Sequence, residues 1–197
     1  MRIILFLVVT STICTLLLAG ARMGYDKASA VFSVRLYGTI LELFGIEAAE
    51  NEIESVFLDN FETETVGSNV YYISRQKEKG TIVFKTSGAG LWSTIELLLA
   101  VSPDLEQLYG LRVISQAETP GLGGRIVELE FQERFRGALV RPGLKVVKFA
   151  SQPNEVDAIT GASITSRSIE KIINSGVADL DRAFGARAGT ERSGGAK

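Results

Sequence analysis

The segment 157–167, DAITGASITSR, combines one acid with several hydroxyl side chains and directly precedes a helical pattern. The apolar positions after it recur at intervals typical of one helix face: Ile169, Ile172, Ile173, Val177, Leu180 and Phe184. The first turn of a helix carries unpaired N–H groups at the positive end of the dipole and can bind a phosphate. The spacing predicts a helix beginning near 163–166, with hydroxyls that could contact a phosphate or be esterified by one. The same residue types also cap helices, so capping without a ligand is the alternative.

A second candidate segment is the Gly-rich loop at 118–124, ETPGLGG, which follows an apolar run typical of a strand at 108–114. Pro120 fixes one backbone angle, whereas three glycines within four residues permit positive φ and close approach of the backbone to a ligand. Such a loop could lie against a planar ring or an anionic group. A turn without a ligand is the alternative, because Gly-rich loops alone indicate binding only weakly.

A third candidate segment, 88–93 or GAGLWS, holds the only Trp of the chain. Aromatic faces stack on planar cofactors, so Trp92 and its neighbour Leu91 could contact a ring system. A core aromatic residue that follows a turn is the alternative interpretation.

The composition excludes several kinds of chemistry. The chain has no His, which excludes a Ser-His-Asp triad, a His general base and a His-ligated metal or haem. Its single Cys, Cys14, cannot alone ligate an iron–sulfur cluster or form an internal disulfide. The net charge of -2 is spread without blocks of one sign, so no nucleic-acid-binding surface is expected. We therefore expect no catalytic residue and no metal site, and an organic cofactor is the option left for a redox protein.

The pattern D-x-x-[ST]-G-A-[ST] at 157–163 resembles the flavinylation motif of the FMN-binding domain family, in which a dedicated transferase joins FMN to the last hydroxyl through a phosphoester bond. The resemblance implies that Ser163 is the acceptor, although most members have Thr there, and Thr165 is the nearest substitute. ETPGLG resembles a second signature, shared by the RnfG component of Rnf ferredoxin:NAD oxidoreductases and the NqrC component of sodium-translocating NADH:quinone reductases, and GLWS is closer to the latter. The resemblance assigns FMN contacts to Asp157, Thr160, Gly161, Ala162, Ser163, Thr165, Glu118, Thr119, Gly121, Leu122, Gly123, Leu91 and Trp92.

This resemblance implies an electron-transfer subunit that carries covalent FMN within an ion-translocating membrane oxidoreductase and has no stand-alone catalytic activity. The implied partners are the other membrane subunits of an Rnf- or quinone-reductase-type complex, a flavin transferase for maturation, and membrane lipid. Two alternatives are a non-redox adaptor with a single membrane span and a periplasmic flavin-binding protein released by signal cleavage.

The N-terminal segment predicts a membrane anchor. Positions 3–20 hold 18 residues without a charge, which span about 27 Å as a helix at about 1.5 Å per residue, close to a hydrocarbon core of about 30 Å. The small residues at 19–21 also fit a signal-peptidase site, which is the alternative. Basic residues flank both ends, so charge does not set the orientation. The family resemblance implies a cytoplasmic N-terminus and an extracytoplasmic domain.

The remaining periodicities predict an α+β fold, in which an antiparallel sheet has helices at its margins. Expected helices cover 31–44, 47–61, 125–135 and the segment from 163, and expected strands cover 69–74, 81–85, 95–101, 108–115 and 144–150. We accordingly expect a transmembrane anchor at 1–23, membrane-proximal helices at 24–62, an FMN-binding domain at 63–184 and a disordered tail at 185–197.

Overall fold

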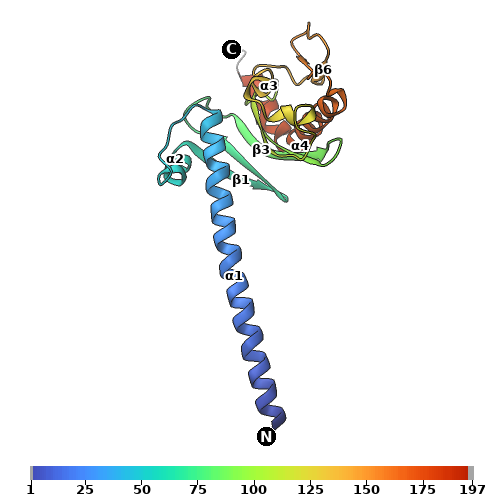
Figure 1. The fold of residues 1–197 in the computed structure, drawn as a ribbon. Coiled ribbons are helices and arrows are strands. Elements are labelled where there is room, and N and C mark those ends of the chain that lie inside the picture. Colours follow the sequence, from blue (N-terminus) through green and yellow to red (C-terminus); the bar gives the residue numbers. More distant parts are fainter. Residues whose placement is uncertain (1, 195–197) are drawn as a thin grey trace.

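One long helix and one compact domain make up the computed structural model (Figure 1), which describes the backbone of residues 2–194 and the side chains of 31–185, with individual side chains before residue 23. Helix α1 (Arg2–Leu43) extends far from the domain and joins it only through its last turns. Gly45, at φ +60°, follows α1, as a helix stop requires. Within the described residues, no helix is both long and apolar enough to cross a membrane. Several positions of the predicted span, among them Ile3 and Leu5, lie outside the described side chains.

The domain is built on a five-stranded sheet in which consecutive strands are neighbours and every pair is antiparallel. The strands are β1 (Phe61–Val66), β2 (Asn69–Ser74), β3 (Ile82–Ala89), β4 (Thr94–Val101) and β5 (Leu108–Ser115). This arrangement confirms the predicted α+β fold with an antiparallel sheet.

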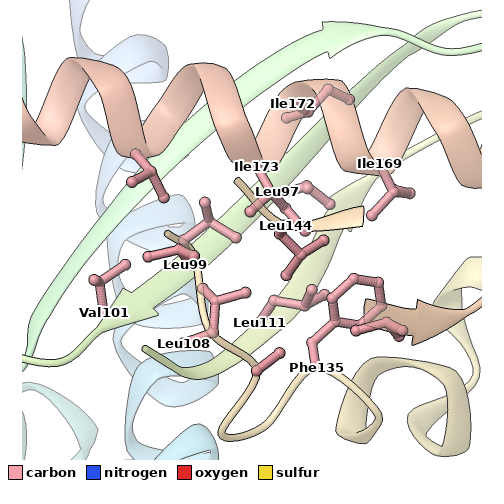
Figure 2. Close-up of a cluster of buried hydrophobic side chains, with 14 of the residues drawn as sticks. Leu97, Leu99, Val101, Leu108, Leu111, Phe135, Leu144, Ile169, Ile172 and Ile173 are labelled. Carbon is pink, nitrogen blue, oxygen red and sulfur yellow. The ribbon is translucent and has the colours of Figure 1, made fainter. Parts of the chain in front are cut away.

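Helices cover both faces of this sheet, which explains why the central strand β4 reads as an unbroken apolar run. Leu97, Leu99 and Val101 pack with α4 (Ser163–Gly194) in one cluster, as Figure 2 shows. The alternate positions, Leu98 and Ala100, pack with the end of α1 and with α2 (Ile53–Asn60) in a second cluster. Because successive side chains of a strand point to opposite faces, two covered faces require apolar residues at every position.

The connection from β5 to α4 consists of short elements. They are a 3₁₀ helix η1 (Gly123–Val127), α3 (Leu129–Glu133), and the parallel pair β6 (Lys145–Val147) and β7 (Glu155–Asp157). The helix predicted at 125–135 is therefore divided, because the backbone of Glu128 is extended, at φ -64° and ψ 128°. The strand predicted at 144–150 is shorter because its partner β7 has only three residues.

Several predicted boundaries differ from the structure. The division at 62/63 falls inside β1, and the residues before it, from the end of α1 through α2, belong to the core of the same domain. The helix predicted from 47 begins at Ile53, after a turn in which the Glu52 N–H donates to the Ala49 carbonyl. The backbone from 185, expected to be disordered, continues as α4 to Gly194, because Ala, Arg and Glu favour a helix.

Candidate functional site

A single carboxylate, that of Glu118, joins the three segments whose sequences suggested a binding site. Its Oε1 accepts hydrogen bonds from the backbone N–H groups of Leu91 and Trp92, each at 3.0 Å. Its Oε2 accepts a hydrogen bond from the Thr165 hydroxyl at 2.7 Å. Glu118 thereby connects the turn between β3 and β4, the Gly-rich loop and the first turn of α4.

The surroundings of Glu118 keep this carboxylate ionised. Only 5% of the residue is exposed, and burial by itself raises the pKa of a carboxyl group. The hydrogen bonds from Trp92, Thr165 and the neighbouring backbone of the turn outweigh burial, so that the pKa of Glu118 lies below its ordinary value. The site therefore contains a buried anion whose known donors all come from the protein.

Two glycines are required by the close approach of other segments to this carboxylate. A Cβ at Gly90 would lie 2.5 Å from Oε1 of Glu118, and one at Gly123 would lie 2.5 Å from the Thr165 hydroxyl oxygen and 3.0 Å from Oε2 of Glu118. Real Cβ atoms do not approach other heavy atoms so closely. Gly90 and Gly123 are thus determined by packing around Glu118.

The predicted hydroxyls at the start of α4 have two different environments. Ser163 is the first residue of α4 and is exposed. Thr165 is 2% exposed and already donates to Glu118, and Ser166, also buried, accepts from the Ile159 N–H at 3.2 Å. Of the two candidate acceptor residues, therefore, Ser163 is accessible and Thr165 has a structural role.

The motif that precedes α4 forms one wall of a cavity of about 480 Å³. Gly161, at φ +84°, turns the chain here, and its position leaves Leu122 of the Gly-rich loop 3.5 Å from where a Cβ would be. Asp157 does not line the cavity; it ends β7 and accepts the Ala150 N–H at 2.6 Å. The lining residues are Val146, Val147, Lys148, Ala158, Ile159, Thr160, Gly161, Ser163 and Arg167.

The apolar residues assigned to ring contacts lie at the surface. Leu91, Trp92 and Leu122 are all exposed, Trp92 to 72%. The alternative of a core Trp is therefore wrong for this turn. Thr119 accepts the Gly124 N–H at 2.9 Å through its carbonyl, and Gly121 has φ +73°, so both shape the Gly-rich loop.

Comparison with known proteins identifies this arrangement. Residues 90–178, which contain all three segments from Leu91 onward, match the model of the FMN-binding domain. Residues 90–178 belong to the FMN-binding domain family.

Similar proteins include two curated relatives of the FMN-binding segment, both of them the NqrC component of a Na(+)-translocating NADH-quinone reductase. The protein from Neisseria meningitidis is 36% identical over 111 residues, which are 52% of this chain and 43% of the relative. The protein from Pasteurella multocida is 33% identical over 160 residues, or 77% of this chain and 56% of the relative. The chain thus spans about half the length of these relatives.

Two solved structures of NqrC proteins share the fold. That from Parabacteroides distasonis has a TM-score of 0.61 at 21% identity and covers 72% of this chain and 87% of that one. That from Shewanella oneidensis has a TM-score of 0.61 at 18% identity and covers 71% and 89%.

The residues of this FMN-binding domain fit a flavin nucleotide at both ends. An exposed hydroxyl and two cations border the cavity where a phosphate would lie, and exposed apolar side chains on the adjacent loops suit a planar ring. Sequence reasoning did not assign a role to Lys148 or Arg167. The spacing of Arg167, four residues after Ser163 on the predicted helix, was the available signal for one of them. Lys148 comes near this site through the pairing of β6 with β7, which was not predicted.

Proposed function

We propose that this chain carries FMN covalently on Ser163 and serves as an electron-transfer subunit of a membrane-bound NADH:quinone reductase of the sodium-translocating type. The observation that carries the proposal is the position of the Glu118 carboxylate, which holds the three FMN-family segments together around an exposed acceptor hydroxyl. A ligand-free adaptor gives no reason for glycines at 90 and 123 or for a buried carboxylate between them.

The acceptor assignment is supported by accessibility. For a phosphoester to form, the Ser163 hydroxyl oxygen must reach phosphorus in an activated flavin nucleotide. The new bond joins this oxygen to phosphorus, a phosphoanhydride P–O bond of the donor breaks, its oxygen leaves with the electron pair, and the hydroxyl proton is released to solvent or to the transferase. Ser163 is exposed at the cavity, whereas Thr165 is buried and engaged with Glu118. We therefore favour Ser163 over Thr165.

The remaining protein groups bind and orient the cofactor. Bound FMN would supply the electron chemistry, and the protein would control its position. Leu91, Trp92 and Leu122 offer apolar contact area for the ring, while Glu118 fixes the turn that carries the first two. Because the chain has no His, this role matches a subunit that needs no general acid or base.

The reductase type is favoured over an Rnf complex because the curated relatives reported above are quinone-reductase subunits. The proposed partners are accordingly the other subunits of such a complex and a flavin transferase. We also propose that residues 1–23 anchor the chain, with a cytoplasmic N-terminus and an extracytoplasmic domain. Support comes from the uncharged run at 3–20 and from the exposure of described side chains there, such as Leu16 and Leu17. Resistance of the chain to carbonate extraction from membranes tests the anchor.

The decisive experiment measures covalent flavin on the full chain made together with a flavin transferase. After denaturing electrophoresis, the wild-type band should fluoresce, and peptide mapping should place the mass of FMN on Ser163. Ser163→Ala should abolish both signals and leave the circular dichroism spectrum unchanged, since it removes at most a cap of about 1 kcal/mol. A colourless wild-type chain rejects the proposal, and FMN mass on Thr165 rejects the acceptor assignment.

A further inference from the structure

Arg167 is exceptional among the arginines of the domain. The chain has eight arginines from 75 to 182, and seven of them have a carboxylate oxygen within 4.0 Å. Among the described residues, Arg167 has no such partner. It is also the arginine that lines the cavity next to Ser163.

Lys148 lines the same cavity from the opposite segment and has the same deficit. Its ammonium group lies 5.2 Å from the ring centroid of Phe149, and no acidic partner is found for it among the described residues. The cavity wall therefore includes two cations and no acid. The acids on adjacent segments are engaged elsewhere: Glu170 accepts the Val146 N–H at 2.7 Å, and Asp157 accepts the Ala150 N–H at 2.6 Å.

Unpaired cations around a concave surface favour an anionic ligand. Arg167 lies four residues after Ser163 on α4, so the two side chains are neighbours on one helix face. Lys148 follows β6, whose parallel partner β7 leads into the 157–163 motif. A guanidinium group can bind two oxygens of a phosphate at once, and an ammonium group adds a point charge.

We propose that Arg167 and Lys148 form the phosphate-binding subsite of this domain, which takes the phosphate of a flavin nucleotide and holds it at the Ser163 hydroxyl. This inference rests on the proposed function and extends it by naming the groups that select a phosphorylated flavin. Arg167 and Lys148 are binding residues here, and the covalent bond itself is made at Ser163.

Non-covalent binding tests the subsite directly. In full-length Ser163→Ala protein, we measure the affinities for FMN and for riboflavin, which lacks the phosphate, from the quenching of flavin fluorescence. FMN should bind at least about tenfold more tightly than riboflavin, and the preference should disappear in a variant that also carries Arg167→Gln and Lys148→Gln. Affinity for riboflavin should stay the same. Inorganic phosphate, added as a competitor, should weaken FMN binding but not riboflavin binding.

Lys171→Gln is the matched control, because Lys171 is an exposed cation of the same helix outside the cavity. This variant should retain the preference for FMN. A preference for FMN that survives loss of both cations, or one that Lys171→Gln also abolishes, overturns the inference.

Covalent loading separates this inference from the proposed function. With a flavin transferase and Ser163 intact, the wild type and Lys171→Gln should load at equal initial rates, and Arg167→Gln with Lys148→Gln should load at least about tenfold more slowly. If the wild type takes no flavin, the proposed function fails and the inference fails with it. If the double variant loads as fast as the wild type and still prefers FMN, only the inference fails.

Discussion

Replacement of Glu118 tests how the site is held together. Glu118→Ala removes three hydrogen bonds to an ionised acceptor, whose net contributions are typically about 1.5–3 kcal/mol each. Leu91 and Trp92 are exposed, so water can replace the carboxylate at their N–H groups at little cost. The Thr165 hydroxyl is buried and loses its partner outright. We therefore expect Glu118→Ala to lower the free energy of unfolding by about 3–4 kcal/mol, less than the simple sum.

Glu118→Gln separates the charge from the shape of this side chain. A Gln oxygen can still accept from Leu91 and Trp92, but a neutral acceptor is about half as strong, and its NH₂ group cannot accept from Thr165. The expected loss is about 1–2 kcal/mol. Urea unfolding followed by far-ultraviolet circular dichroism measures both values, with Glu130→Gln as the control because that exposed carboxylate pairs only with Arg134 at the surface. A Glu118→Ala protein within about 0.5 kcal/mol of the wild type, the usual range for surface substitutions, would refute the reasoning.

The stabilisation from Glu118 should depend on pH in a defined direction. The pKa of Glu118 is lowered in the folded protein from its ordinary value of 4.5, by hydrogen bonds that outweigh burial. A lowered pKa means that the unfolded chain binds a proton more readily, so ionised Glu118 stabilises the fold above pH 4.5. This contribution is lost as pH falls through the lower folded-state pKa. The difference in stability between wild type and Glu118→Gln should be constant near neutrality and shrink below about pH 4.5.

Two further substitutions probe the same contacts. Thr165→Val should cost about 1–3 kcal/mol, because it leaves a buried oxygen of Glu118 without its donor, yet covalent flavin should remain; loss of flavin from a folded Thr165→Val protein would favour Thr165 as acceptor. Gly123→Ala should destabilise by about 1–3 kcal/mol, since its Cβ would lie 2.5 Å from the Thr165 oxygen, whereas Gly143→Ala, with its nearest contact at 3.8 Å, should change stability little; thermal unfolding of the pair decides, and equal shifts would contradict the packing argument.

Local periodicity predicted the parts of the fold that depend on local burial. The bounds of β2 and β5 agree with the sequence pattern, and α4 begins at Ser163, because alternating or helical apolar spacing reports which face is buried. Strand β1, with the sequence FETETV, was missed because it is an edge strand whose exposed positions are acidic and whose apolar content is low. The three residues of β7 are too few to produce a pattern.

The assembly of the site could not be predicted in the same way. Glu118 was recognised as part of a signature, but its partners lie 26, 27 and 47 residues away in the chain. No local pattern indicates that a carboxylate will meet those backbone groups. Arg167 and Lys148 present the opposite difficulty, since what distinguishes them is the lack of an acidic partner among the described residues, and only the folded arrangement reveals that.

On the proposed function, the charges at the two ends of the site determine which way round the cofactor lies. Lys148 and Arg167 border the cavity beside Ser163, whereas the ring end contains the Glu118 carboxylate, whose oxygens are already occupied by donors. Two unit charges about 8 Å apart interact by about 2 kcal/mol at an effective dielectric constant of about 20, and solvent screening reduces this value. A phosphate gains this attraction at the cationic end and meets repulsion near Glu118, so a flavin nucleotide favours the orientation that presents phosphorus to the Ser163 hydroxyl. The covalent bond then makes permanent an orientation that electrostatics has already selected.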